Sequence, residues 1–100
     1  MSEYVSVSIT RNNKGPSSHK AVFKRKDGRS KTINFGLMGA KTFIDSADQK
    51  TRKNYLKRHA PRENWNVPDT AGSLSARIKW GKSKNISENI RAFKKKFKLK

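Results

Sequence analysis

The chain of 100 residues is long enough for one small domain with a modest hydrophobic core. Its 25 Lys and Arg residues against seven Asp and Glu give a formal net charge of +18, while hydrophobic residues make up only 32%. Because there is no cysteine, a disulfide framework and a thiolate metal site are excluded.

The charge itself indicates the class of partner. A chain this basic repels itself unless polyanions neutralise it, so nucleic acid is the expected partner and an anionic membrane surface is the second. No apolar run approaches the length of a membrane span, and the N-terminus lacks the pattern of a secretory signal. We therefore expect a protein of the cytosol or nucleus.

The first 45 residues have the alternating pattern of β-strands. Between Tyr4 and Ile9 the pattern places Val5, Val7 and Ile9 on one face of a half-buried strand. Residues 11–18 have loop composition, and two further strands are expected at 19–26 and 29–35. A short fourth strand is expected at 41–44.

Asp27-Gly28 predicts a two-residue hairpin turn between the second and third strands. This turn places Val22 opposite Ile33, and Phe23 opposite Thr32. Val22, Ile33 and Phe35 then share the core face with the first strand, whereas Phe23 and Arg25 lie on the other face. There Phe23 is either a stacking platform for nucleic acid or is covered by a later helix.

The second half of the chain reads as three short helices. Ser46 with Gln49 forms a capping box for the first, which ends at about His59 or Ala60 before Pro61. Asp48 and Arg52 are spaced to pair at i, i+4. The opposite face of this helix carries Lys50, Lys53 and Lys57, a solvated face that is also suited to phosphate contact.

A proline-bounded loop at 61–68 follows, and its Trp65 is expected to plug the core. Asp69 or Thr70 caps the second helix, over about 71–80, which is rich in small residues and suited to close packing. Together this loop and helix form the expected scaffold and protein-interaction surface, namely Trp65, Leu74, Ile78 and Trp80.

The third helix begins after Asn85 as N-cap and has a clear apolar stripe at Ile86, Ile90, Phe93 and Phe97. Its other side is basic. The helix either packs by its stripe and presents its cations to a polyanion, or docks as a whole on an anionic membrane. With the earlier cations, the expected polyanion-binding residues are Arg25, Lys50, Lys53, Lys57, Arg91, Lys94, Lys95, Lys96 and Lys98.

Strands followed by helices predict an α+β fold, with one domain over 1–100, a β-rich half at 1–45 and a helical half at 46–100. The N-terminal antiparallel hairpin is expected to belong to a sheet of three or four strands. No catalytic set has convincing spacing. His59 and Glu63 are spaced as a base and its orienter, but a histidine at a helix C-terminus is better explained by the helix dipole. The acidic residues are too scattered to complete a zinc site with the two histidines. We expect a protein that is not an enzyme and needs no metal or other cofactor.

The segment 54–81 also carries a resemblance. It contains Tyr55, Arg58-His59, Arg62-Glu63-Asn64-Trp65, Pro68, Thr70-Ala71-Gly72, Leu74-Ser75 and Trp80, and a basic helix ending Lys95-Lys96-Phe97 follows. With Asn34-Phe35-Gly36 and Thr42-Phe43-Ile44-Asp45, this pattern resembles a family of small basic proteins of unknown function. Its members are encoded by large double-stranded DNA viruses of algae and amoebae, the chlorella-virus and mimivirus groups. Lys79 departs from the pattern, because an apolar residue is expected there.

The resemblance implies a viral setting but no catalytic residues. It favours a virion structural protein, a minor capsid or core component whose basic surface meets the genome or an anionic membrane. Its partners would be other virion proteins and DNA or another polyanion, without a small-molecule substrate. Its location would be the virion, and the host cytoplasm or nucleus during assembly. The alternative is a free nucleic-acid-binding protein without sequence specificity, acting in genome compaction or gene expression.

Overall fold

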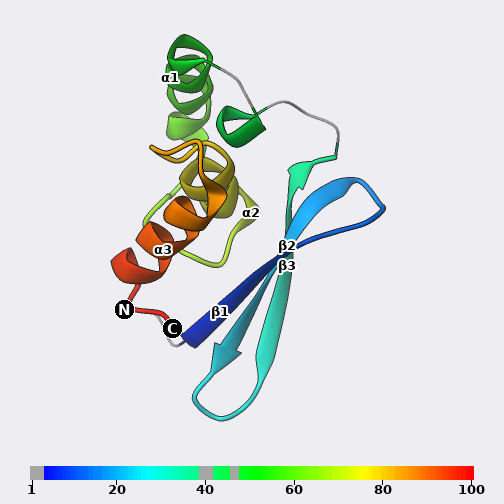
Figure 1. Ribbon diagram of the computed structural model, residues 1–100. Helices are drawn as coiled ribbons and strands as arrows, with labels where there is room; N and C mark the ends of the chain where they lie inside the picture. The colour runs from blue at the N-terminus through cyan, green and yellow to red at the C-terminus, as the bar shows by residue number, and fades with distance from the viewer. Residues whose placement is uncertain (1–3, 39–41, 46–47) are drawn as a thin grey trace.

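The computed structural model describes residues 4–38, 42–45 and 48–100. Three strands come first: β1 (Tyr4–Arg11), β2 (Ser17–Arg25) and β3 (Ser30–Leu37). The helices follow, with 3₁₀ turns η1 (Phe43–Asp45) and η2 (Ala60–Arg62), α-helices α1 (Gln49–His59), α2 (Ala71–Leu74) and α3 (Ile86–Lys96), and a π-helical segment η3 (Ser75–Lys79). The predicted α+β class is confirmed. In Figure 1 the helices lie together to one side of a long twisted sheet.

The sheet is antiparallel in the order β1-β2-β3. Its hairpin turn differs from the prediction, because Arg25 N–H donates to the Arg29 carbonyl at 2.7 Å and Gly28 N–H donates to the Arg25 carbonyl at 3.0 Å. The loop therefore has three residues, with Gly28 at φ 93°. Phe23 pairs with Lys31 and Val22 with Thr32, one residue away from the predicted register.

A shift of one residue exchanges the two faces of a strand. Phe23 is accordingly fully buried, and its ring lies 6.4 Å from that of Phe93 on α3. The interpretation of Phe23 as a helix-covered core residue is confirmed, and its assignment as a stacking platform is wrong. Arg25 moves with it to the helix-covered side, and Val22 lies on the opposite side, away from the core.

The first strand also departs from simple alternation. Tyr4 pairs with Arg25 and Ser6 pairs with Lys24, so Val5 is the extra residue of a β-bulge. Tyr4 is buried at 6% exposure, whereas Val5 is 40% exposed. The predicted core position of Val5 is therefore wrong, while Val7 and Ile9 keep theirs at the hydrophobic cluster.

The link into α1 contains no fourth strand among its described residues, because Phe43–Asp45 forms a 3₁₀ turn. Lys41 and Ser46 lie outside the described residues. The N-cap of α1 is Asp48, whose side chain accepts from Thr51 N–H at 2.8 Å. Asp48 is thus a cap and not the predicted partner of Arg52.

The segment Ala71–Trp80 is helical as predicted, with Thr70 as N-cap accepting from Ser73 N–H at 3.1 Å. It widens to π-helical geometry from Ser75. Leu74 and Ile78 are fully buried and join Phe23, Phe35 and Phe93 in the core. Trp65 does not plug this core: it is half-buried outside the cluster.

The third helix matches its prediction. Asn85 caps it, accepting from Ser87 N–H at 2.9 Å, and its apolar stripe packs on the cluster. After α3 the chain turns at Lys98, with φ 55°, and buries Leu99. Lys100 then pairs with the open edge of β1, donating to the Val5 carbonyl and accepting from Val7 N–H. Among the described residues, no helix has the length and apolar character that crossing a membrane requires.

Candidate polyanion-binding surface

The lysine face of α1 is presented to solvent. Lys50, Lys53 and Lys57 are all exposed, and no residue of this helix is fully buried. Their i, i+3, i+7 spacing places them on one side of the helix. The predicted grouping of these three lysines is therefore consistent with the helix geometry.

The other side of α1 is held by aromatic stacking. The Tyr55 ring lies 4.4 Å from the Trp80 ring at an interplanar angle of 10°, and His59 lies 4.2 Å beyond Tyr55. Arg52 Nε donates to the carbonyls of Trp80 and Gly81, both at 3.0 Å. These contacts fix α1 to the end of η3, so that its lysines point away.

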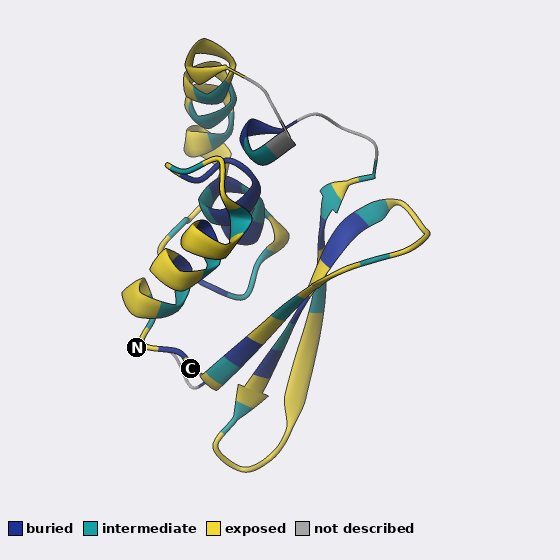
Figure 2. Cartoon of the chain, viewed as in Figure 1, coloured by how far each residue is buried: buried dark blue, intermediate teal, exposed yellow. Residues whose placement is uncertain are grey.

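The second basic group lies on α3. Arg91, Lys95 and Lys96 are exposed, and Lys94 is half-buried, while Phe93 on the opposite side is buried. Lys98 follows the helix and is also exposed. Figure 2 shows exposed positions along the outer side of α3 and over most of α1. The two lysine-rich groups belong to separate helices that point in different directions in Figure 1.

Four acidic side chains in the described part of the chain contact residues that are close to them in the sequence. Asp27 accepts from Arg29 N–H in the hairpin turn, Asp48 caps α1, and Glu88 accepts from the Ser83 hydroxyl. The Glu63 carboxylate lies directly against Gly72. Among the described residues, none of the ion pairs involves a lysine of α1 or α3, although the pKa of Asp48 is lowered by its hydrogen bonds to Thr51 and, to a smaller extent, by the charge of Lys50.

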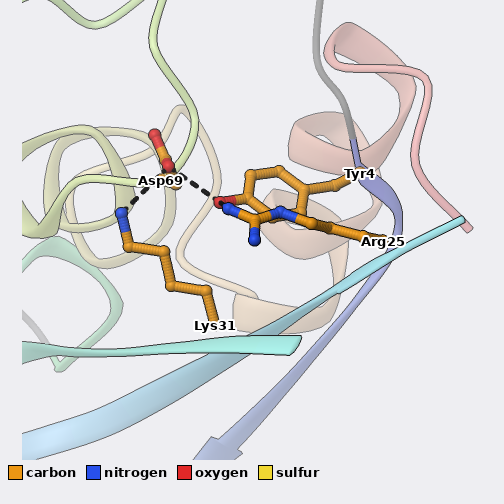
Figure 3. A network of polar contacts seen from close by, with 4 residues as sticks. All are labelled: Tyr4, Arg25, Lys31 and Asp69. Carbon is orange, nitrogen blue, oxygen red and sulfur yellow. Dashed lines mark hydrogen bonds and ion pairs between the residues drawn. The ribbon is translucent and has the colours of Figure 1, made fainter. Parts of the chain in front are cut away.

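Asp69 is the centre of an internal polar network (Figure 3). Its Oδ2 accepts from the Tyr4 hydroxyl at 3.0 Å and from Lys31 Nζ at 3.3 Å. Burial raises the pKa of Asp69, but the hydrogen bonds from Tyr4 and Lys31 and the charge of Lys31 together lower it below its ordinary value. Burial is also the main cause that raises the pKa of Tyr4.

Arg25 belongs to this network and not to the polyanion surface. It is half-buried, with its guanidinium 5.3 Å from the centre of the Tyr4 ring and one nitrogen 3.5 Å from the Tyr4 hydroxyl. The two-residue turn predicted Arg25 on the open face of the sheet. That prediction is wrong, because the three-residue turn places Arg25 on the helix-covered face.

Two other cations are internal. Arg77 Nε donates to the Trp65 carbonyl at 2.9 Å, its guanidinium lies over the Phe97 ring, and burial lowers its pKa. Lys79, which departs from the family pattern, is 3% exposed and donates to the Ser18 hydroxyl at 2.9 Å. Both contact neighbouring elements of the fold, and Lys79 is buried while Arg77 is half-buried.

The proposed protein-interaction residues are mostly internal as well. Leu74 and Ile78 are fully buried, and Trp80 is 8% exposed beneath Tyr55. Trp65 is half-buried, and its indole N–H is buried without a hydrogen-bond partner among the described residues. These residues are the scaffold for α1 and α3 and not an open contact surface.

Sequence reasoning missed the cations on the open face of the sheet. Lys20 and Lys24 are exposed on β2, and they alternate with the buried Ala21 and Phe23. Their neighbours on this face are mostly polar: Ser6, Ser8 and Thr10 on β1, and Ser30, Thr32 and Asn34 on β3. The sequence shows the alternation of β2, but the predicted two-residue turn exchanged the buried and exposed faces of this strand.

Comparison with known proteins places the chain in a family. A family model matches residues 7–59, which is more than half of the chain and covers the sheet and α1. The chain belongs to the family of unknown function DUF5754. The DUF5754 match ends at residue 59, so most of the segment 54–81 that carried the sequence resemblance lies beyond it.

A relative of this chain is encoded by a virus. The DUF5754 chain is 35% identical to the Uncharacterized protein L851 of Acanthamoeba polyphaga mimivirus over 80 residues, covering 74% of this chain and 80% of that protein. The predicted resemblance to a viral family of unknown function is thereby confirmed. No solved structure shows significant similarity to this chain.

Proposed function

We propose that this protein is a non-enzymatic virion structural component, a minor capsid or core protein that holds the viral genome through its basic surface. The observation that carries the proposal is the pair of exposed lysine-rich helices α1 and α3, whose lysines form no ion pair with an acidic side chain among the described residues. The mimiviral origin of a relative supports the viral setting.

The expected mode of binding is contact with the phosphate backbone. Lysine ammonium groups are point charges that neutralise phosphates and release counter-ions, which gives affinity without sequence information. Base reading requires Arg, Asn or Gln side chains arranged along a groove-fitting element. Most of the exposed cations of α1 and α3 are lysines, although Asn54 and Arg58 are also exposed on α1. Binding is therefore expected to depend on salt and to be nearly independent of sequence.

Quantitative mass spectrometry of purified virions tests the structural role. The proposal expects the protein in many copies per particle, in a constant ratio to the capsid proteins. If the protein is abundant in infected cells and absent from purified particles, the virion role is wrong.

A free nucleic-acid-binding protein in genome compaction or gene expression is the second candidate. The same exposed lysine faces favour it, because backbone binding does not require a capsid. It predicts cross-linking to nucleic acid in infected cells before particles assemble, and exclusion from finished virions. Lack of detectable binding to DNA or RNA at physiological salt contradicts both candidates in their nucleic-acid-binding form.

A further inference from the structure

The strand β1 lies at the edge of the sheet, and part of its backbone faces away from β2. Val7 N–H donates to the Lys100 carbonyl, so Val7 directs its backbone groups away from β2. In an antiparallel pair, residues alternate between bonding to the neighbour and facing away from it. Ile9 and Arg11 therefore also direct their N–H and C=O groups outward.

A second observation fixes the same alternation from the other end of the strand. Asn12 N–H donates to the Ser18 carbonyl at 2.8 Å, so the even-numbered residues face β2. The structure shows no partner for the outward groups of Ile9 and Arg11 among the described residues. Two successive outward-facing residues form a short template for another strand.

The chain already uses this edge beside Val5 and Val7. Lys100 donates to the Val5 carbonyl at 3.0 Å and accepts from Val7 N–H at 3.1 Å, which is the pattern of parallel pairing. The edge is therefore geometrically able to accept a strand. Ile9 and Arg11 extend it in the same direction.

A hollow of about 460 Å³ lies beside these two residues, between β1 and the start of α3. Its apolar lining consists of half-buried isoleucines from β1, η1 and α3, namely Ile9, Ile44, Ile86 and Ile90. Arg11 and Lys84 are its exposed cations, and no acidic residue lines it among the side chains that the structure describes. It matches an aliphatic side chain next to a carboxylate.

We propose that the β1 edge at Ile9–Arg11 binds an extended acidic segment of a partner protein by strand addition. The partner's backbone pairs with Ile9 and Arg11, one of its aliphatic side chains enters the isoleucine-lined hollow, and its carboxylates meet Arg11 and Lys84. Backbone pairing supplies affinity, and the hollow supplies selectivity.

Nucleic acid fits this edge less well than a peptide. A phosphate accepts hydrogen bonds but donates none, so it leaves the outward carbonyls of β1 facing a negative charge. A peptide strand satisfies both the N–H and the C=O groups. The site therefore differs in ligand class from the lysine faces, and the two can be tested separately.

The test is amide hydrogen exchange of the full chain, measured by NMR, with a blocked six-residue peptide of sequence Val-Val-Glu-Glu-Val-Val, which presents both valine and glutamate on each face of the strand. The proposal expects exchange at Ile9 and Arg11 to be fast in the free protein and to slow at least about tenfold at saturating peptide. The same peptide with N-methylated backbone nitrogens is expected to bind at least about tenfold more weakly, because it cannot complete the pairing.

A pair of edge variants provides the matched control. Ile9→Pro removes an outward N–H from β1. Thr32→Pro is the matching change on β3: Val22 directs its backbone groups toward Ser8 on β1, so Thr32, which lies opposite Val22 on β3, directs its own groups outward. Only Ile9→Pro is expected to weaken peptide binding, by about tenfold, while DNA binding stays unchanged. If Ile9→Pro does not fold, the N-methylated peptide still decides the question.

Three results would overturn the proposal. The first is equal binding of the N-methylated peptide, which would assign the hollow to side-chain or small-amphiphile binding. The second is peptide binding without slower exchange at Ile9 and Arg11. The third is equal slowing of exchange at these two amides by an oligothymidylate, which would make the edge part of the nucleic-acid surface.

Discussion

The two lysine-bearing helices are attached to the molecule in different ways. Helix α3 buries Phe93 in the core and packs Ile86, Ile90 and Phe97 against it. Helix α1 buries no residue fully, and its described contacts centre on the Tyr55–Trp80 stack and Arg52. Helix α3 is therefore expected to unfold only together with the core. Helix α1 is attached through a few contacts and is expected to unfold locally at a lower free-energy cost.

The largest expected effect of a substitution is therefore on the α3 side. Phe93→Ala removes a fully buried ring and is expected to lower the free energy of unfolding by about 3–5 kcal/mol. In a small domain of marginal stability this unfolds a large fraction of the molecules. Urea titration followed by circular dichroism measures it. Ala92→Ser, on the exposed side of the same helix, is the control and should change stability by less than about 0.5 kcal/mol.

A substitution at the α1 attachment should act locally. Tyr55→Ala removes the ring that contacts both Trp80 and His59. It is expected to lower the free energy of local unfolding of α1 by about 1–2 kcal/mol, which appears mainly as faster amide exchange within this helix. Tyr55→Phe keeps the stack and serves as the control. Equal loss of protection in the sheet after Tyr55→Ala would show that α1 and the core unfold as one unit, against the comparison drawn above.

The Asp69 network gives a smaller effect that depends on pH. Because the folded-state pKa of Asp69 lies below its ordinary value of 3.8, the carboxylate stabilises the fold above that pH. This contribution is lost as the pH falls from about 4 through the folded-state pKa. Asp69→Asn is expected to cost about 1 kcal/mol at pH 7, and progressively less as the pH falls below about 4. A difference between the proteins that stays constant from pH 7 to pH 2 is the contrary result.

Local sequence patterns predicted the helices and strands well, because caps, prolines and apolar stripes act within a few residues. Asn85, Pro61 and the stripe from Ile86 to Phe97 are of this kind. The faces of the sheet were not predictable in the same way. A three-residue turn at 26–28 and a bulge at Val5 each shift alternation by one residue, and each exchanges the buried and exposed sides.

In the candidate site, too, positions set by local spacing were predicted and positions set by the turn or by distant contacts were not. The lysines of α1 and α3 were found because helical spacing alone places them on one side. Arg25 was misplaced, and Lys20 and Lys24 were missed, because their side of the sheet depends on the turn. The internal roles of Arg77 and Lys79 depend on contacts with Trp65 and Ser18, which are 12 and 61 residues away in sequence. No local pattern records such contacts.

The most direct test of the account is the salt dependence of DNA binding by two triple variants with equal loss of charge. Lys50→Gln, Lys53→Gln and Lys57→Gln together remove the α1 face, whereas Lys20→Gln, Lys24→Gln and Lys26→Gln remove three exposed charges from β2 and its turn. We predict that the α1 variant reduces the slope of log K against log salt by about 2–3, and that the β2 variant changes it by less than about 1. Equal slopes for both variants would contradict it, because binding would then follow net charge and not the lysine-rich helices.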